Sequence, residues 1–323
     1  MVYDLGGGTF DVTVLSINGD DIEVKSTCGL SQTGGYFFDQ KIVKYVCKCM
    51  EDEGIDLEDE DYKDELQELY LKAEKCKIQL SNKEQTDIVM KVGKIRKNIT
   101  ITREFFETQL KNYYMRTESK MKEALRNAGM KLDEIDEIIL IGGSSKIPYF
   151  SRRIQEYSGK LPSSEMPQDE AVALGAALYG SQQKKFTDVC SHSIGIVTVD
   201  EKQKKMVNSI LIKKNTQIPV TVNQRFLTYG STSELPVQIT EGEFTEIQNV
   251  TIIGDFIIDL PEGLPKGTKV DILINLDENQ IIHIFVNIEC IKLHKEFHFD
   301  RLHNMSDEEV DKLKGLVMQT RIE

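Results

Sequence analysis

Three consecutive glycines between two acidic residues constrain this chain more than any other feature. They stand in DLGGGTFD at residues 4–11, where the flanking patterns predict two strands joined by a tight turn. Glycines lack a Cβ, so the turn can bend sharply and present N–H groups to a phosphate. A strand follows the turn, rather than a helix opened by Gly-Lys-Ser/Thr, which excludes a Walker P-loop. We therefore expect a phosphate-binding hairpin, with Asp4 and Asp11 able to hold water around a magnesium ion, over a plain glycine-rich turn.

A second glycine turn lies at residues 140–148, which read LIGGSSKIP. The pattern predicts a short strand buried on both faces, two glycines, and a helix with Pro148 at its first position. Ligands of open α/β sheets bind beyond the carboxyl ends of strands, and a helix N-terminus favours an anion. Two such turns in one chain favour a nucleotide-binding site.

The hydrophobic pattern changes near residue 181. Before it, strands alternate with amphipathic helices, including a stripe through residues 66–80 and a helix capped by Thr102 that ends at Gly129, with an interruption near Thr117 that can divide it. After it come short alternating segments, such as residues 270–276, that are typical of a β-sandwich. We expect an α/β part followed by an all-β part, joined by a linker at residues 181–190.

The composition excludes several classes of protein. The chain has 323 residues, 40% apolar and 29% charged, which suits a globular protein of two domains. Its net charge of −13 argues against a nucleic-acid or anionic-membrane binder, and no apolar run is long enough to span a bilayer. The start MVYDLGGG has no signal-peptide features, and six scattered cysteines suit reduced thiols, so we expect a cytoplasmic protein.

Five motifs occur in an order that resembles the heat-shock protein 70 (DnaK-type) chaperone family. They are DLGGGTFDV at 4–12, TGGYFFD at 33–39, LIGGSSKIP at 140–148, DEAVALGAA at 169–177 and KKNTQIP at 213–219. The resemblance implies the second lobe of an actin/hexokinase-type (ribonuclease H-like) ATPase domain at 1–180, a linker at 181–190, a peptide-binding β-sandwich at 191–302 and the start of a helical lid at 303–323. It implies ATP-regulated binding and folding of extended hydrophobic polypeptide segments.

The resemblance also implies which residues hold ATP or ADP with Mg²⁺. In the family, the phosphates bind the first glycine turn, magnesium lies near Asp4, and adenosine lies between a polar helical stripe and the second glycine turn. The cofactor-binding residues implied here are Gly7, Gly8, Thr9, Glu74, Lys77, Ser81, Gly143, Ser144, Lys146 and Asp169. The alternative for Glu74 and Lys77 is a surface helix pair, and for Asp169 a helix N-cap.

Departures from the family's pattern lower the nucleotide affinity that we expect. Tyr36 and Phe37 replace an acidic pair. The arginine that stacks on adenine corresponds to Ile78, and the arginine after the second glycine turn corresponds to Lys146. Neither replacement supplies the planar guanidinium that stacks and forms bidentate contacts.

The family's first lobe is expected to be missing, because the chain starts almost at the second phosphate loop. That lobe carries the other phosphate loop, a lysine and a water-orienting glutamate. Phosphoryl transfer needs charge stabilisation from both sides of the cleft, so we expect no ATP hydrolysis by this chain alone and assign no catalytic residue. The helix at 170–180 is apolar on nearly every side, which predicts an exposed apolar patch unless a partner covers it.

For the β-rich part the resemblance implies a cleft for an extended apolar peptide. Its lining would be Ile196, Val199, Phe226, Tyr229, Leu235 and Val237, for each of which the alternative is a place in the sandwich core. A capping box at 306–309 predicts the start of the lid helix, and a lid that stops at Glu323 predicts fast peptide release. The implied partners are unfolded polypeptides, with J-domain and nucleotide-exchange co-chaperones, and neither nucleic acid nor membrane.

Two other functions compete with a nucleotide-regulated chaperone. A nucleotide-independent peptide-binding module (a holdase) would use only the sandwich. A sugar kinase or an actin-like filament protein would share the glycine hairpins, but the strands after residue 190 speak against it.

Overall fold

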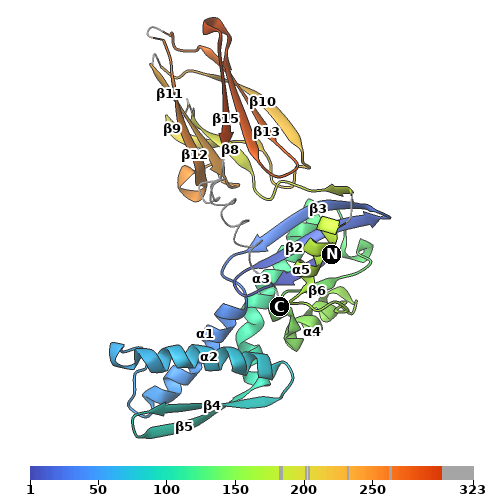
Figure 1. Cartoon of the computed structure of the whole chain (residues 1–323), viewed down its shortest axis with the longest axis vertical. Helices are drawn as coiled ribbons and strands as arrows, with labels where there is room; N and C mark the ends of the chain where they lie inside the picture. The colour runs from blue at the N-terminus through green and yellow to red at the C-terminus, as the bar shows by residue number, and fades with distance from the viewer. Residues whose placement is uncertain (182–184, 201, 203, 231–232, 262–263, 300–323) are drawn as a thin grey trace, which may run out of the picture. The chain divides into compact units, whose positions relative to one another are not determined.

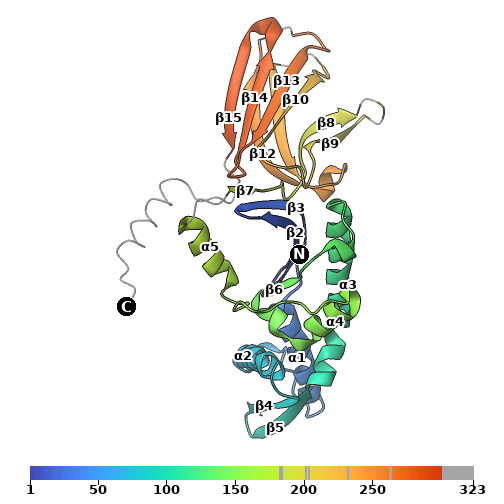
Figure 2. The ribbon, with the colours of Figure 1, turned by 90° about the vertical axis from the view of Figure 1, so that its right-hand side faces the viewer.

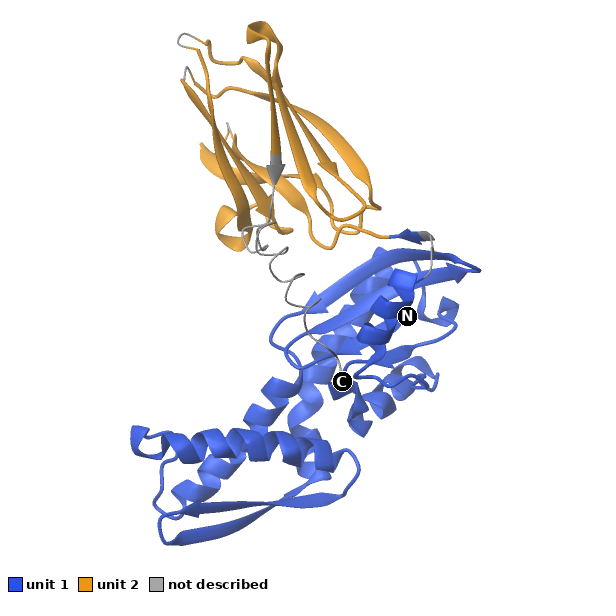
Figure 3. Cartoon of the chain, in the orientation of Figure 1, with its two compact units in different colours: residues 1–187 blue, residues 188–323 orange. Residues whose placement is uncertain are grey.

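The computed structural model describes residues 1–181, 185–200, 202, 204–230, 233–261 and 264–299. The chain divides into two units, residues 1–187 and residues from 188 onward, which Figure 3 distinguishes by colour. This boundary falls inside the segment expected as a linker. The expected lid at 303–323 lies outside the described residues. In the described ranges no helix is both long and apolar enough to cross a membrane.

The first unit is built on a five-stranded sheet in the order β6-β1-β2-β3-β7. Its strands are β1 (Val2–Leu5), β2 (Phe10–Asn18), β3 (Asp21–Leu30), β6 (Ile139–Ile141) and β7 (Lys185–Thr187). Strands β1, β2 and β3 are antiparallel neighbours, and the glycines of residues 6–8 form the predicted tight turn between β1 and β2. β6 and β7 add in parallel at the two edges, so part of the expected linker is a strand of this unit.

The apolar run before the second glycine turn is less buried than its sequence predicts. β6 is an edge strand of three residues, in which Leu140 is buried but Ile139 and Ile141 are only half-buried. A strand with a single neighbour in its sheet has less cover than a central one. The expected burial on both faces is therefore wrong for β6.

Helices and a second hairpin complete the core of the first unit (Figure 1). They are α1 (Gly35–Glu51), α2 (Lys63–Leu80), β4 (Gln85–Val92), β5 (Ile95–Thr102), α3 (Arg103–Asn127) and α4 (Pro148–Ser158), with short 3₁₀ turns at Glu60–Tyr62, Leu132–Glu134 and Gly143–Lys146. The last helix of the unit, α5 (Ala171–Ser181), contributes no residue to this core. Phe38, Ile42 and Val46 of α1 are buried, as their spacing predicts. α2 and α1 pack side by side, and α2 also covers β4.

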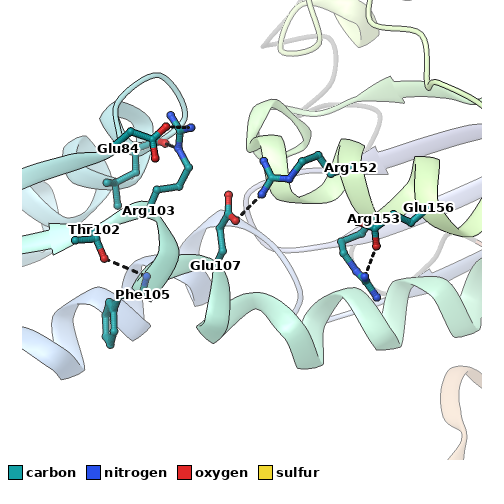
Figure 4. A network of polar contacts seen from close by, with 9 residues as sticks. Glu84, Thr102, Arg103, Phe105, Glu107, Arg152, Arg153 and Glu156 are labelled. Carbon is teal, nitrogen blue, oxygen red and sulfur yellow. Dashed lines mark hydrogen bonds and ion pairs between the residues drawn. The ribbon is translucent and has the colours of Figure 1, made fainter.

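Helix α3 runs without interruption, so the expected division near Thr117 is wrong. Thr117 is fully buried, and its hydroxyl donates to the carbonyl of Tyr114 and accepts from the Tyr3 hydroxyl, both at 2.9 Å. These bonds satisfy the polar side chain inside the helix, which therefore continues past it. The predicted ends are confirmed: the Thr102 hydroxyl accepts from the N–H of Phe105, and Gly129 has φ 67° (Figure 4).

Ion pairs hold α3 to its neighbours. Arg103 at its start pairs with Glu84 at 2.7 Å, and Glu107 one turn later pairs with Arg152 of α4 at 2.5 Å (Figure 4). The second pair links α3 to α4, the helix that follows the second glycine turn.

Helix α5 stands apart from the other helices of its unit (Figure 2). Ala171 is buried, whereas Val172 is 66% exposed, Leu178 55% and Tyr179 67%. The Phe186 ring lies edge-on to Tyr179, with 6.3 Å between the ring centres, but among the described residues these three side chains stay mainly exposed. The expected exposed apolar patch is present in the structure.

The second unit consists of two four-stranded antiparallel sheets, β12-β11-β8-β9 and β10-β13-β14-β15. Its strands are β8 (Ile194–Asp200), β9 (Lys205–Ile212), β10 (Val220–Leu227), β11 (Glu234–Glu241), β12 (Thr251–Asp259), β13 (Lys269–Leu276), β14 (Ile282–Ile288) and β15 (Leu293–Phe299). Buried side chains from both sheets form one core. The strict alternation at 270–276 correctly predicts that every second residue of β13 is buried.

We predict that Thr102→Ala lowers the free energy of unfolding by about 1 kcal/mol, because the N–H of Phe105 loses its cap. Urea unfolding followed by circular dichroism measures the change. Thr108→Ala, on the exposed face of the same helix and outside the cap, is the control and should change stability less. Equal losses in the two variants would contradict the assigned cap.

Candidate functional site

One large cavity in the first unit, with a volume of about 1210 Å³, gathers residues from five separate segments. They are the turn between β1 and β2, the start of α1, one face of α2, the segment from Leu140 to Ser151, and the stretch before α5. All ten residues expected to bind a cofactor line it: Gly7, Gly8, Thr9, Glu74, Lys77, Ser81, Gly143, Ser144, Lys146 and Asp169. Residues far apart in sequence thus meet where the two glycine turns predict a ligand.

Backbone hydrogen bonds fix the glycine turn to the segment that starts α1. The N–H of Gly35 donates to the carbonyl of Gly6 at 3.0 Å, and the N–H of Tyr36 donates to that of Gly7 at 2.8 Å. Gly34, at φ 155°, is what allows this approach, because a Cβ there would lie 2.6 Å from the Gly6 oxygen. The cavity wall at α1 is therefore set by backbone contact.

The first glycine turn leaves open space at its tip. Gly7, Gly8 and Thr9 are exposed, and a Cβ added at Gly7 or Gly8 would meet no atom within 4 Å. Packing within the described chain therefore does not require glycine at these two positions. Their lack of a side chain fits a ligand that approaches the backbone closely, as a phosphate does.

Asp4 lies beneath the second glycine turn rather than on the cavity wall. A Cβ at Gly142, which has φ 83°, would lie 2.5 Å from Asp4 Oδ1. Asp4 faces Asp11 across the β1–β2 ladder, and burial first, then the charge of Asp11, raises its pKa. The described residues hold no group of three or more metal-ligating side chains. Two neighbouring carboxylates fit Mg²⁺, which keeps several waters and takes ligand phosphates in place of a full protein cage.

The second glycine turn differs from its expected form. A 3₁₀ turn, Gly143–Lys146, follows the two glycines, and α4 begins only at Pro148. The glycines therefore stand at the N-terminus of a one-turn 3₁₀ helix and not of the α-helix, so the dipole of α4 does not start at them. Ser144 instead ties this turn to the first one, because its hydroxyl donates to the carbonyl of Gly6 at 2.8 Å.

An exposed ion pair also lines the cavity. Lys146 Nζ lies 2.7 Å from Asp169 Oδ2. The hydrogen bond from Lys146 lowers the pKa of Asp169, which is thus ionised at neutral pH. Asp169 precedes α5 by two residues, so Glu170 and not Asp169 stands at the N-cap position, and the alternative of a helix N-cap is wrong for Asp169.

The polar stripe on α2 faces the cavity. The structure adds one residue of α1, Asp39, which the sequence does not predict as a member of the site. Lys77 is 9% exposed, and its Nζ lies 2.7 Å from Asp39 Oδ2 on α1. Asp39, 7% exposed, also lines the cavity. One feature of the sequence indicates a role for Asp39. It directly follows Phe38 on the buried face of α1, where a carboxylate needs a partner.

Apolar side chains line the cavity around Ile78, the position at which the family's arginine is replaced. Tyr36 is 53% exposed and Ile78 57%, and both line the cavity together with Tyr70 and Leu71. This part of the wall can contact a flat apolar ring but offers it no charge.

The six residues expected to line a peptide cleft divide into three groups. Ile196 of β8 and Val237 of β11 are buried in the core of the second unit, at 3% and 1% exposure. Phe226 and Leu235 are half-buried against that core, and Val199 is also half-buried. Tyr229 is exposed, with Lys266 Nζ 5.0 Å from its ring centre. The structure thus places four of them at one core, and the cleft itself stays a prediction.

Comparisons with known proteins agree with these motifs. The family model described as "Hsp70 protein" matches residues 1–321. A curated relative, "Heat shock 70 kDa protein, mitochondrial" of Solanum tuberosum, is 32% identical over 329 residues, which covers 97% of this chain and 47% of the relative. The chain therefore spans about half the length of that relative. The relative is named mitochondrial, so the comparison does not support the expected cytoplasmic location.

We predict that Gly34→Ala displaces the glycine turn, because its Cβ cannot coexist with the Gly6 oxygen at 2.6 Å. Amide chemical shifts of Gly6, Gly7 and Gly8 should move and the melting temperature should fall. Gly175→Ala in α5, where a Cβ meets nothing within 4 Å, is the matched control. Unchanged glycine shifts in Gly34→Ala would contradict the described approach.

Proposed function

Because the chain belongs to the heat-shock protein 70 family, we propose that it is a chaperone whose first unit binds an adenine nucleotide with Mg²⁺ and whose second unit binds extended apolar polypeptide segments. The observation that carries the proposal is the single cavity lined by all ten residues implied by the family's motifs. Mg²⁺, when bound, neutralises phosphate charge, and ATP or ADP is the ligand that these residues fit.

Each part of the cavity suits one part of the nucleotide. The open backbone of Gly7 and Gly8 suits the β- and γ-phosphates, with Asp4 and Asp11 behind it for the hydrated metal ion. The polar stripe of α2 and the Gly143–Lys146 turn suit the adenosine. We infer a weakened affinity, because Ile78 and Lys146 stand where guanidinium groups would stack and form bidentate bonds.

We predict that Ile78→Arg tightens ADP binding by about three- to tenfold, because a guanidinium supplies the missing stacking on the adenine. Isothermal titration calorimetry measures the change. Met115→Arg, exposed on α3 and outside the cavity, controls for the added charge. If both variants bind ADP as the unaltered chain does, the position proposed for the adenine is wrong.

We also propose that this polypeptide by itself does not hydrolyse ATP. Gly7, Gly8 and Thr9 are exposed, and a Cβ at Gly7 or Gly8 would meet no described atom within 4 Å, so the tip of the turn is open. Charge stabilisation from one side supplies only part of what phosphoryl transfer requires.

The 323-residue polypeptide should release no phosphate from ATP above the buffer background. Charge stabilisation from one side of the phosphates is insufficient for phosphoryl transfer. A coupled phosphate assay measures it, with Asp4→Ala as the comparison. Turnover that is present in the unaltered chain and lost in Asp4→Ala would refute this expectation. Turnover of equal size in both would come from a contaminating ATPase.

The second unit offers the alternative function, a nucleotide-independent holdase. Its two sheets form a core of their own, so peptide binding there does not need the first unit's cavity. The affinity of a fluorescent apolar heptapeptide, measured with and without ATP, separates the two functions. A change on adding ATP supports the regulated chaperone, and an unchanged affinity supports the holdase.

A further inference from the structure

Lys77 and Asp39 form a buried ion pair in the cavity wall. Their side chains are 11% and 10% exposed, and Lys77 Nζ lies 2.7 Å from Asp39 Oδ2. The same ammonium donates to the carbonyl of Gly35 at 3.2 Å. Gly35 opens α1, and its N–H bonds to the glycine turn. One lysine therefore joins α2 to the segment that supports the turn.

This pair is not arranged for greatest stability. The second carboxylate oxygen, Asp39 Oδ1, is buried without a hydrogen-bond partner among the described residues. Burying two charges is costly, and the cost is recovered only when every polar atom is satisfied. A buried pair with an unsatisfied oxygen, on the wall of the main cavity, indicates a role in the site.

We propose that Asp39 is a positioning residue: it holds the Lys77 ammonium at the cavity wall and thereby sets the affinity of the cavity for its nucleotide. This inference rests on the proposed function of the cavity. An ammonium group has three N–H donors, and Asp39 and Gly35 take two of them. The third is left for a ligand hydroxyl or ring nitrogen.

The chain offers Lys77 another carboxylate if Asp39 loses its charge. Glu74 lies three residues earlier on the same face of α2, lines the cavity and is exposed. A lysine on a flexible four-carbon stem would then turn toward Glu74 and solvent. Asp39 keeps the ammonium against Gly35 instead.

Lowering the pH should release Lys77 in the same way as removing the charge of Asp39 by substitution. Burial raises the pKa of Asp39 to about 6, which Lys77 opposes and the charge of Glu74 reinforces. Cys76, which also faces Asp39 from α2, has its pKa raised to about 12 by burial, then by Asp39, so it remains a neutral thiol. Because the folded-state pKa of Asp39 lies near 6, the carboxylate that holds Lys77 at pH 7 is lost as the pH falls through that value.

The position of Lys77 can be measured without any nucleotide. Acetic anhydride labels accessible lysines, and mass spectrometry gives the labelling of Lys77 relative to Lys75, an exposed lysine of the same helix. Asp39→Asn should raise this ratio about tenfold, as expected for loss of a charged hydrogen bond. In the unaltered chain the ratio should rise between about pH 7.5 and about pH 5.5.

Glu53→Gln is the matched control. Lys97 Nζ lies 2.7 Å from Glu53 Oε1 and donates to the carbonyl of Cys49 at 2.7 Å, so the bonding pattern is the same, but the pair is more exposed and lies outside the cavity. This variant should change the labelling of Lys97 and leave that of Lys77 unaltered.

The second measurement is ADP affinity in the unaltered chain and in Asp39→Asn. The variant should bind about tenfold more weakly at neutral pH and lose the weakening that the unaltered chain shows on acidification. If the unaltered chain binds no ADP, the proposed function fails, and the labelling ratio still decides the role of Asp39.

Two results would overturn the inference. One is an unchanged Lys77 to Lys75 ratio in folded Asp39→Asn. The other is ADP binding of equal strength and equal pH dependence in the variant and the unaltered chain. Should Asp39→Asn fail to fold, the pH series of the unaltered chain decides, and a constant ratio from about pH 7.5 to about pH 5.5 refutes the role.

Discussion

The carbonyl oxygen of Gly6 is the atom on which the arrangement of the first unit's cavity depends. It accepts hydrogen bonds from the N–H of Gly35 and from the hydroxyl of Ser144, which belong to segments more than a hundred residues apart. A Cβ at Gly34 would lie 2.6 Å from this oxygen, so a side chain there would push the start of α1 away from the first glycine turn. A backbone oxygen therefore brings together three loops that carry ligand-binding groups. The helices behind these loops hold them in place, but the contacts of the loops themselves set the form of the cavity.

Backbone and side chains have different roles in this cavity. The turn has open space at Gly7 and Gly8 for a charged ligand, while the charged side chains of the wall are largely engaged with one another. Lys77 and Lys146 both have acidic partners within the site. Each cation is thus held in place before a ligand arrives, which lowers the cost of ordering it on binding.

The sequence predicted what depends on local rules. The cap at Thr102, the glycine after α3 and the alternation in β13 follow from propensity and periodicity, and the structure has all of them. Contacts between distant segments escaped prediction: Thr117 was read as an interruption because its partner Tyr3 lies 114 residues away. Asp39 was missed for the same reason, since only the folded chain places it against Lys77. The motifs predicted which residues line the cavity. They could not show that Lys77 and Lys146 are already paired with acidic side chains.

Strand β3 has a mechanical consequence for the first unit. At its beginning, Asp21 to Glu23 pair with β7, the last described segment before the second unit, and its end leads directly into the Thr33–Gly34 bend beneath the glycine turn. An extended strand resists stretching far more than a loop does, so a pull on β7 reaches the bend as a shift along the strand axis. The edge at which the first unit continues into residue 188 and the bend under the glycine turn are thus at the two ends of one ten-residue strand.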